Sequence, residues 1–132
     1  MNDEVRAEEY RTLAEIRHQL RRFHRFSELA AVGAGLTGRQ HQAMLAICAS
    51  EGGLLIRELA DRMFLRAHTI TELVDRLEKS SLVKRVQDRS DRRKVRVSLT
   101  EQGLAVLASL SDSHRAELRE VGPLLSQLMA KL

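Results

Sequence analysis

The sequence is poor in several residue types, and each shortage excludes a class of protein. Cys48 is the only cysteine, so no disulfide bond can form within one chain. Tryptophan is absent and aromatic residues make up 3%, which disfavours a single-strand nucleic-acid binder, because such proteins stack bases on several rings. No apolar run approaches the ~20 residues that span a bilayer, and the first twenty residues contain no cleavage pattern. We therefore expect a cytoplasmic protein.

The sequence also lacks the motifs of enzymes and metal proteins. It contains no nucleophile motif, phosphate-binding loop, carboxylate dyad signature or dinucleotide fingerprint. Its five histidines show no metal-ligand spacing; they are His18, His24, His41, His68 and His114. We expect no enzymatic activity, no cofactor and no metal site.

The composition that remains is that of a folded domain with a localised positive charge. Apolar residues make up 43% and charged residues 30% of the 132 residues, which predicts a single domain over residues 1–132, or one subunit of a dimer. Residues 62–96 carry eleven basic and five acidic side chains, whereas the rest of the chain carries eleven and thirteen. A basic surface of this kind attracts polyanions, although a charge run alone usually means only a solvated face.

The apolar spacing predicts two helices in the first third of the chain. One covers residues 4–31, where apolar side chains recur every three, four or seven positions. The second begins at a capping box formed by Thr37 and Gln40 and ends at two consecutive glycines. Its predicted buried face consists of Met44, Leu45, Ile47 and Cys48. Residues 54–56 are expected to add a short strand.

The middle of the chain predicts a winged helix-turn-helix. Two helices, over residues 57–63 and 67–80, are joined by a tight turn. Two strands, over residues 83–87 and 95–99, enclose a charged and polar loop. The second helix has an apolar stripe for anchoring it to the domain: Ile70, Leu73, Val74 and Leu77. In this arrangement the second helix can enter a DNA major groove while the ribbon tip reaches a neighbouring minor groove.

The ends of the chain predict a dimer. A further helix is expected over residues 100–121, capped by Thr100, broken at Gly122-Pro123 and followed by a short amphipathic helix. The helices within residues 1–35 and 101–132 carry longer apolar stripes than the winged part, residues 36–100, can cover. A two-fold dimer would bury them and place two reading helices about 34 Å apart, to match a pseudo-palindromic site. The alternative is a monomer whose terminal helices pack on each other.

Several short motifs occur together in a characteristic order. They are Glu58-Leu59-Ala60, Thr69-Ile70-Thr71, residues 73–78, Leu82-Val83, Asp91-Arg92-Arg93 and residues 97–103. From about Leu13 to Leu132 the chain thereby resembles the MarR (multiple antibiotic resistance regulator) family of bacterial transcription factors. The resemblance implies a mainly α fold with a small β-wing, and a homodimer held by the first and last helices. It also implies binding to double-stranded operator DNA, most often as a repressor, with release by a small aromatic or phenolic acid or by cysteine oxidation.

The match of positions 66–71 to the family's recognition helix, together with residue type, indicates the candidate DNA-binding residues. They are Arg66, Ala67, His68, Thr69, Thr71, Arg76, Arg92, Arg93 and Lys94. By resemblance, Arg93 matches the residue that enters the minor groove, and Asp91 matches the acid that holds the wing tip, with Arg76 as a candidate partner. Three more basic residues could equally be DNA contacts or ordinary surface charges: Lys79, Lys84 and Arg85.

The chain departs from the family pattern at three positions. Phe64 lies in the turn where the family often has Gly, and Arg66 lies at the helix start where it often has Ser. Leu55 similarly replaces a Ser or Thr. A missing side-chain cap costs about 1 kcal/mol, so another group must satisfy the amides at the start of the second helix.

The leading hypothesis is a sequence-specific transcriptional regulator, a repressor relieved by a small-molecule effector. The candidate effector pocket consists of Arg17, His18, Phe23 and His41. One alternative is a winged-helix module that binds proteins. Another is a redox-sensing regulator that uses Cys48, although its place on an apolar helix face favours a core role, because a buried thiol is inert unless its pKa is lowered.

Overall fold

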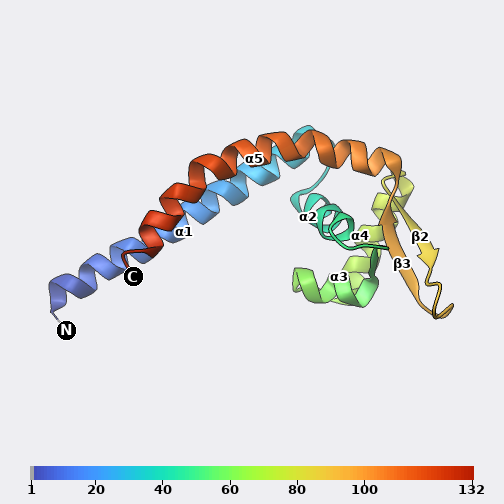
Figure 1. Ribbon diagram of the computed structural model, residues 1–132, viewed down its shortest axis with the longest axis horizontal. Helices are drawn as coiled ribbons and strands as arrows, with labels where there is room; N and C mark the ends of the chain where they lie inside the picture. Colours follow the sequence, from blue (N-terminus) through green and yellow to red (C-terminus); the bar gives the residue numbers. More distant parts are fainter. Residues whose placement is uncertain (1) are drawn as a thin grey trace.

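The computed structural model describes residues 2–132, and helices dominate this part of the chain (Figure 1). In chain order the elements are α1 (Asp3–Gly33), α2 (Gly38–Cys48), β1 (Leu54–Leu55), α3 (Ile56–Met63), α4 (Ala67–Lys79), β2 (Val83–Gln87), β3 (Val95–Leu99) and α5 (Glu101–Met129). The predicted order of helix, turn, helix and ribbon is confirmed. No helix among the described residues is long and apolar enough to cross a membrane.

The elements from α2 to β3 form the winged part, with one contiguous core. The stripe predicted for α4 is buried: Ile70, Leu73, Val74 and Leu77 are at most 8% exposed. These side chains pack with Met44 and Ile47 of α2 and Leu59 of α3. Because α4 is anchored by its apolar face, its opposite face stays in solvent.

The three strands form an antiparallel sheet in the order β1-β3-β2. Val83 pairs with Leu99 at one end of the β2–β3 ribbon, and Gln87 pairs with Val95 at the other. Leu54 of β1 pairs with Val97, which is fully buried. The alternation predicted for residues 95–99 therefore describes a strand with one face on the core.

The helices α1 and α5 lie side by side and form an arm that extends away from the winged part (Figure 1). The first turns of α1 reach beyond the C terminus in this view. Each helix starts at a side-chain cap: Asn2 accepts a hydrogen bond from the Glu4 amide, and Thr100 from the Gly103 amide. The capping box of α2 is also present, since Thr37 and Gln40 exchange hydrogen bonds of 2.9 and 3.1 Å.

The predicted break at Gly122-Pro123 is wrong, because α5 continues through Pro123 to Met129. Proline removes one backbone donor and bends a helix, but it ends the helix only if flanking contacts do not hold both sides. Here Val121 is buried before Pro123, and Leu125 and Leu128 are half-buried after it. Figure 1 shows the result as a single arched helix lying along α1.

The predicted buried face of α2 is partly wrong. Met44 and Ile47 are buried, but Leu45 is 51% exposed and Cys48 is exposed. The buried stripe is narrower than the sequence suggested and centres on residues 43, 44 and 47. Cys48 is the last residue of α2, where the helix leaves the core, so it is not a core thiol.

Candidate nucleic-acid interface

The first turn of α4 presents an exposed, uncapped helix end. Arg66 occupies the N-cap position in extended backbone, and its side chain makes no capping hydrogen bond. The helix therefore begins with backbone amides that no side chain of the described chain caps, at the positive end of its dipole. Such an end is a favourable place for a phosphate group.

The polar face of α4 carries the candidate base-reading side chains. Arg66, Ala67, His68 and Arg76 are exposed, and Thr69 and Thr71 are half-buried. The His68 Nε2 lies 3.3 Å from the Glu72 carboxylate, and Thr71 donates to the Ala67 carbonyl at 3.0 Å. These partners are one helical turn away, so each polar side chain is oriented along the outer surface of the helix.

The turn before α4 contains a strained residue. Phe64 adopts φ 55° and ψ 39°, in the left-handed region, and is 94% exposed. This conformation allows the Leu65 amide to donate to the Ala60 carbonyl at 3.0 Å, which closes α3. The position that often holds Gly in the family thus keeps its backbone geometry here, at a cost of about 1–2 kcal/mol for a non-glycine residue.

The α3 start is capped from within the helix. Leu55 has no side-chain acceptor, but the Glu58 carboxylate accepts from the Leu55 amide at 2.9 Å. Glu58 also lies 3.5 Å from the Arg96 guanidinium of β3. One carboxylate therefore links the start of α3 to the wing.

The wing tip is held by two aspartates. Asp88 accepts from the Ser90 hydroxyl at 2.6 Å, from the Asp91 amide at 3.1 Å and from the Arg96 guanidinium at 2.8 Å. The hydrogen bond from Arg96, followed by that from Ser90, lowers the pKa of Asp88 to about 2. Asp88 is consequently ionised at any physiological pH and fixes the base of the loop.

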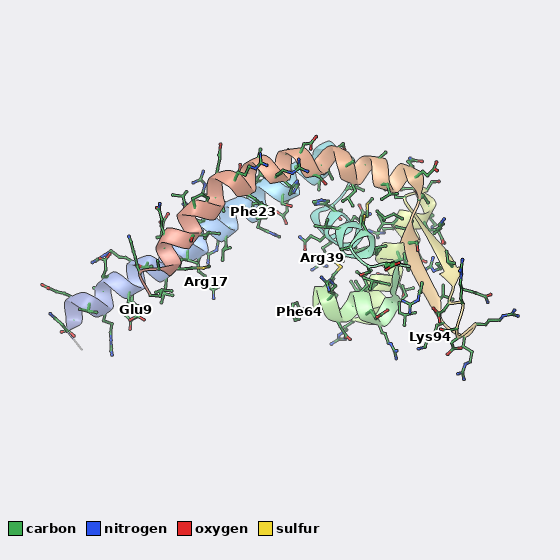
Figure 2. All side chains as sticks on the ribbon, viewed as in Figure 1. Glu9, Arg17, Phe23, Arg39, Phe64 and Lys94 are labelled. Atoms are coloured by element: carbon green, nitrogen blue, oxygen red, sulfur yellow. The ribbon has the colours of Figure 1, made fainter. Side chains whose placement is uncertain are left out.

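Asp91 holds Arg93, not Arg76. It accepts from the Arg93 amide at 3.0 Å and from the Arg93 Nε at 3.1 Å, and these contacts lower the pKa of Asp91. The candidate pairing with Arg76 is therefore wrong, because a partner two residues away satisfies the carboxylate. The Arg93 side chain nevertheless remains 92% exposed, and Arg92 and Lys94 are exposed beside it. Figure 2 shows Lys94 at the projecting end of the wing.

Arg85 connects the wing to α4. Its guanidinium lies 2.7 Å from the Asp75 carboxylate and 2.8 Å from the Glu78 carboxylate, both on α4. Its side chain is only 29% exposed. Of the three basic residues left open by the sequence, Arg85 is thus engaged within the subunit, whereas Lys79 and Lys84 are exposed. No local pattern in the sequence indicates that Arg85 binds both carboxylates, since they lie seven and ten residues away in the chain.

A separate cavity of about 780 Å³ lies between α1, α2 and α5. It contains two of the four candidate effector residues, Phe23 and His41. Arg17 lines a different hollow on the arm, and His18 lines neither of the two. Sequence reasoning missed the α5 side of the cavity: Ser111, His114, Arg115, Leu118 and Arg119.

His41 is the most unusual side chain in this cavity. It is 5% exposed, and its Nδ1 is the one buried side-chain nitrogen or oxygen without a hydrogen-bond partner among the described residues. Its ring lies 4.7 Å from that of His114, centroid to centroid. Burial, and secondarily the charge of His114, lower the pKa of His41. The Nε2 of His114 lies 2.9 Å from the Ser27 hydroxyl oxygen, and its Nδ1 lies 2.8 Å from the Leu110 carbonyl oxygen.

Comparison with known proteins identifies the family of this chain. A family model described as "MarR family" matches residues 34–94. The structure of a MarR family protein from Bacillus stearothermophilus is 30% identical, with a TM-score of 0.71, and the match covers 92% of this chain and 81% of that one. The chain belongs to the MarR family.

Two further relatives differ in how much of the molecule they match. The uncharacterized HTH-type transcriptional regulator YsmB of Bacillus subtilis (strain 168) is 37% identical over 70 residues, which are 53% of this chain and 48% of YsmB. The match thus spans about half the length of this curated relative. The crystal structure of CouR from Rhodococcus jostii RHA1 bound to p-coumaroyl-CoA is 32% identical, with a TM-score of 0.65, covering 70% of this chain and 64% of CouR.

Proposed function

We propose that this protein is a transcriptional regulator that binds specific double-stranded DNA sequences. The observation that carries the proposal is the pairing of an exposed, uncapped α4 start with a projecting cationic wing. In this arrangement α4 enters the major groove, and the wing tip enters the adjacent minor groove. The family membership supports the same function, as does the curated name of YsmB.

The candidate contacts divide into two groups by chemistry. His68 is exposed on α4, and Thr69 and Thr71 are half-buried beside it. These side chains supply hydrogen bonds to base edges or phosphates, with Thr71 as an acceptor because its hydroxyl already donates to the Ala67 carbonyl. Arg92, Arg93 and Lys94 supply positive charge at the wing, where a narrow minor groove has a strongly negative potential. The first group carries sequence preference, and the second carries affinity and salt dependence.

Replacing Arg93 with Ala tests the role of the wing. A binding site is first selected from random duplexes, and fluorescence anisotropy then gives the affinity at several salt concentrations. We expect at least tenfold weaker binding, and a salt slope reduced by roughly 0.9 for each phosphate that the variant no longer neutralises. Arg22→Ala, on the exposed face of α1, is the matched control and should bind as the wild type does. Unchanged affinity of the Arg93 variant would refute the assignment.

We infer that the active form is a homodimer held by α1 and α5. The 31 residues of α1 extend over about 46 Å at 1.5 Å per residue, and the arm leaves large apolar side chains exposed. These are Val5, Tyr10, Leu13, Leu20, Leu118, Leu124, Met129 and Leu132. A two-fold partner would cover them and present a second α4 to a pseudo-palindromic operator. Sedimentation equilibrium tests this state directly.

We further propose that the protein represses transcription. A small aromatic or phenolic acid relieves this repression by binding in the cavity between α1, α2 and α5. The buried His41 Nδ1 offers an unused hydrogen-bonding atom, and Arg115 and Arg119 line the same cavity. The CouR structure holds an acyl-CoA ligand, which favours effector binding in this family. Salicylate and benzoate are suitable probes: release of bound DNA should occur with the wild type and be abolished by His41→Phe.

A further inference from the structure

Three helices meet at one imidazole where the winged part joins the arm. There α2 packs against both α1 and α5 (Figure 1). The Nε2 of His114, on α5, lies 2.9 Å from the Ser27 hydroxyl oxygen of α1, and the ring of His114 lies 4.7 Å from that of His41 on α2. His41 precedes Met44 of the winged core by three residues on the same buried face of α2. The contact between the two histidines therefore links the winged core to the arm.

The surroundings of His41 suit only its neutral form. A charged imidazole donates hydrogen bonds from both ring nitrogens, but the His41 Nδ1 is buried and has no partner among the described residues. The neutral ring leaves that nitrogen without a proton, which costs less than burying a charge. Burial, and secondarily the charge of His114, accordingly lower the pKa of His41.

His114 is held in place on both sides of its ring. Its Nδ1 lies 2.8 Å from the Leu110 carbonyl oxygen, which can only accept, so Nδ1 carries a proton. Its Nε2 faces the Ser27 hydroxyl, which can donate or accept. The edges of the Phe23 and Phe26 rings also contact it, with centroids 6.2 and 5.6 Å away. His41 is thus the partner of the pair that is free to move.

The other charged groups around the pair are cationic. Arg115 and Arg119 of α5 line the same cavity, as does His24 of α1, whose Nε2 lies 3.1 Å from the Glu28 carboxylate. No carboxylate and no further charged group of α2 lines the cavity among the described residues. A proton added to His41 in its present position would meet positive neighbours and no counter-ion.

We propose that protonation of His41 breaks its contact with His114, and that the winged part then shifts against the arm and releases DNA. The cavity of about 780 Å³ beside the ring gives the charged imidazole space and water. The neutral contact keeps the DNA-binding arrangement, and acid favours the released one. This inference rests on the proposed DNA binding and adds a signal, the pH, that regulates it.

Proton linkage gives the sign of the effect. The pKa of His41 in the contact is lowered from the usual 6.5, whereas a ring exposed to water in the released arrangement binds a proton more readily. The released arrangement therefore gains protons as the pH falls below the usual value for histidine. DNA affinity should be complete above this pH and should decrease below it.

The pH dependence of DNA binding tests the proposal. Fluorescence anisotropy with a selected operator, in buffers without carboxylic or aromatic acids, gives the affinity of the wild type and of His41→Gln. Between about pH 7.5 and about pH 5.5 the wild type should weaken about tenfold more than His41→Gln, which cannot be protonated. The comparison cancels any titration of His68, which both proteins carry. If His41→Gln is unstable, His41→Phe fills the same site and serves the same comparison.

The matched control is His18→Gln. His18 is exposed on α1 and lines neither the cavity beside His41 nor the hollow that contains Arg17. This variant should keep the full response of the wild type to acid, because its histidine has no part in the contact between α2 and α5.

NMR of the free protein shows whether the proton and the movement are coupled. The His41 ring signals, assigned by their loss in His41→Gln, should titrate together with the amide signals of α2 and α5 around the cavity. The nuclear Overhauser effect between the His41 and His114 rings should disappear in acid. Circular dichroism at both pH values checks that the helices remain intact.

Several results would overturn the proposal. They are an equal response of the wild type and His41→Gln to acid, a lost response in His18→Gln, and a ring contact that persists after His41 has titrated. Loss of helix at the lower pH would also overturn it, because unfolding would then explain the release.

The outcome is separable from the proposed function. If the wild type binds its operator at neutral pH but responds to acid as His41→Gln does, DNA recognition stands and only the role of His41 falls. If the wild type binds no selected duplex, the proposed function falls, and the release of DNA falls with it.

Discussion

Two glycines of α5 should respond very differently to the same substitution. A Cβ at Gly103 would overlap the Leu82 carbonyl oxygen and lie 3.1 Å from the carbonyl carbon. A Cβ at Gly122 would meet nothing within 4 Å apart from its chain neighbours and the backbone of α5 itself, but the Pro123 ring that follows disfavours a helical residue with a Cβ at this position. Alanine should therefore destabilise the protein at Gly103, where α5 leaves the wing, and change its stability little at Gly122, on the arm.

The expected size follows from the contacts at each site. Overpacking at Gly103 costs about 1–3 kcal/mol, and displacing Leu82 weakens the 3.1 Å hydrogen bond that its carbonyl accepts from the Thr100 amide, worth about 1 kcal/mol. The helix propensity gained by replacing glycine with alanine offsets about 1 kcal/mol. The net destabilisation at Gly103 is about 2 kcal/mol, whereas at Gly122 the gain in helix propensity of about 1 kcal/mol is offset by the clash of the new Cβ with the Pro123 ring.

Thermal unfolding followed by circular dichroism measures both effects. For a chain of this length 1 kcal/mol shifts Tm by roughly 4 °C, so Gly103→Ala should melt about 8 °C lower, whereas Gly122→Ala should melt at nearly the same temperature as the wild type. Two protein concentrations separate these shifts from any change in dimerisation. A Gly103→Ala protein as stable as the wild type would refute the close approach of α5 to Leu82.

Three other consequences concern the wing and Cys48. The pKa of Asp88 lies at about 2, below its usual 3.8, so its ion pair with Arg96 should be nearly complete above about pH 4 and half lost at about pH 2. An NMR titration of the carboxyl group measures this, and Arg96→Met should raise the pKa only part of the way to its usual value, because the hydrogen bonds from Ser90 and the Asp91 amide still lower it. Arg85→Met should lower the free energy of unfolding, measured in urea, by about 1 kcal/mol. Lys84→Met, at the exposed neighbouring residue, should change it by less than about 0.5 kcal/mol. Equal effects of the two substitutions would contradict the ion pairs of Arg85 with Asp75 and Glu78. Cys48 should react with a thiol reagent in the native protein without denaturant, since it is exposed; protection until unfolding would contradict its position.

Local signals predicted most of the winged part. Thr37 and Gln40 form the predicted capping box, and the strands over residues 83–87 and 95–99 have the predicted bounds. These features depend on side chains within a few residues of one another, where helix and strand periodicities are sufficient. The same reasoning failed at Pro123, because contacts of α5 with distant α1, invisible in a local window, hold the helix together across the missing hydrogen bond.

The sequence also could not predict which residues are buried at the end of α2. Cys48 lies four residues after buried Met44, which predicts the same face. However, a periodic pattern gives a direction around the helix axis and not the length over which neighbouring elements cover that face. The core contacts of α2 end at Ile47, so Cys48 remains in solvent. Leu45 is exposed for a different reason, because it points away from the buried stripe of α2.

The basic segment shows why a charge count overstates a DNA-binding surface. Residues 62–96 hold eleven basic side chains, yet Arg85 and Arg96 are bound by carboxylates of the same subunit. They orient the wing against α4 and α3, and their charge is already balanced. Arg92 and Lys94 have no such partner among the described residues, and the Arg93 guanidinium, although held by Asp91, is 92% exposed. The cations that can reach phosphate therefore include those at the tip, and the internal pairs determine where that tip lies. A DNA-binding wing of this design needs both kinds of arginine, and only their contacts in space distinguish them.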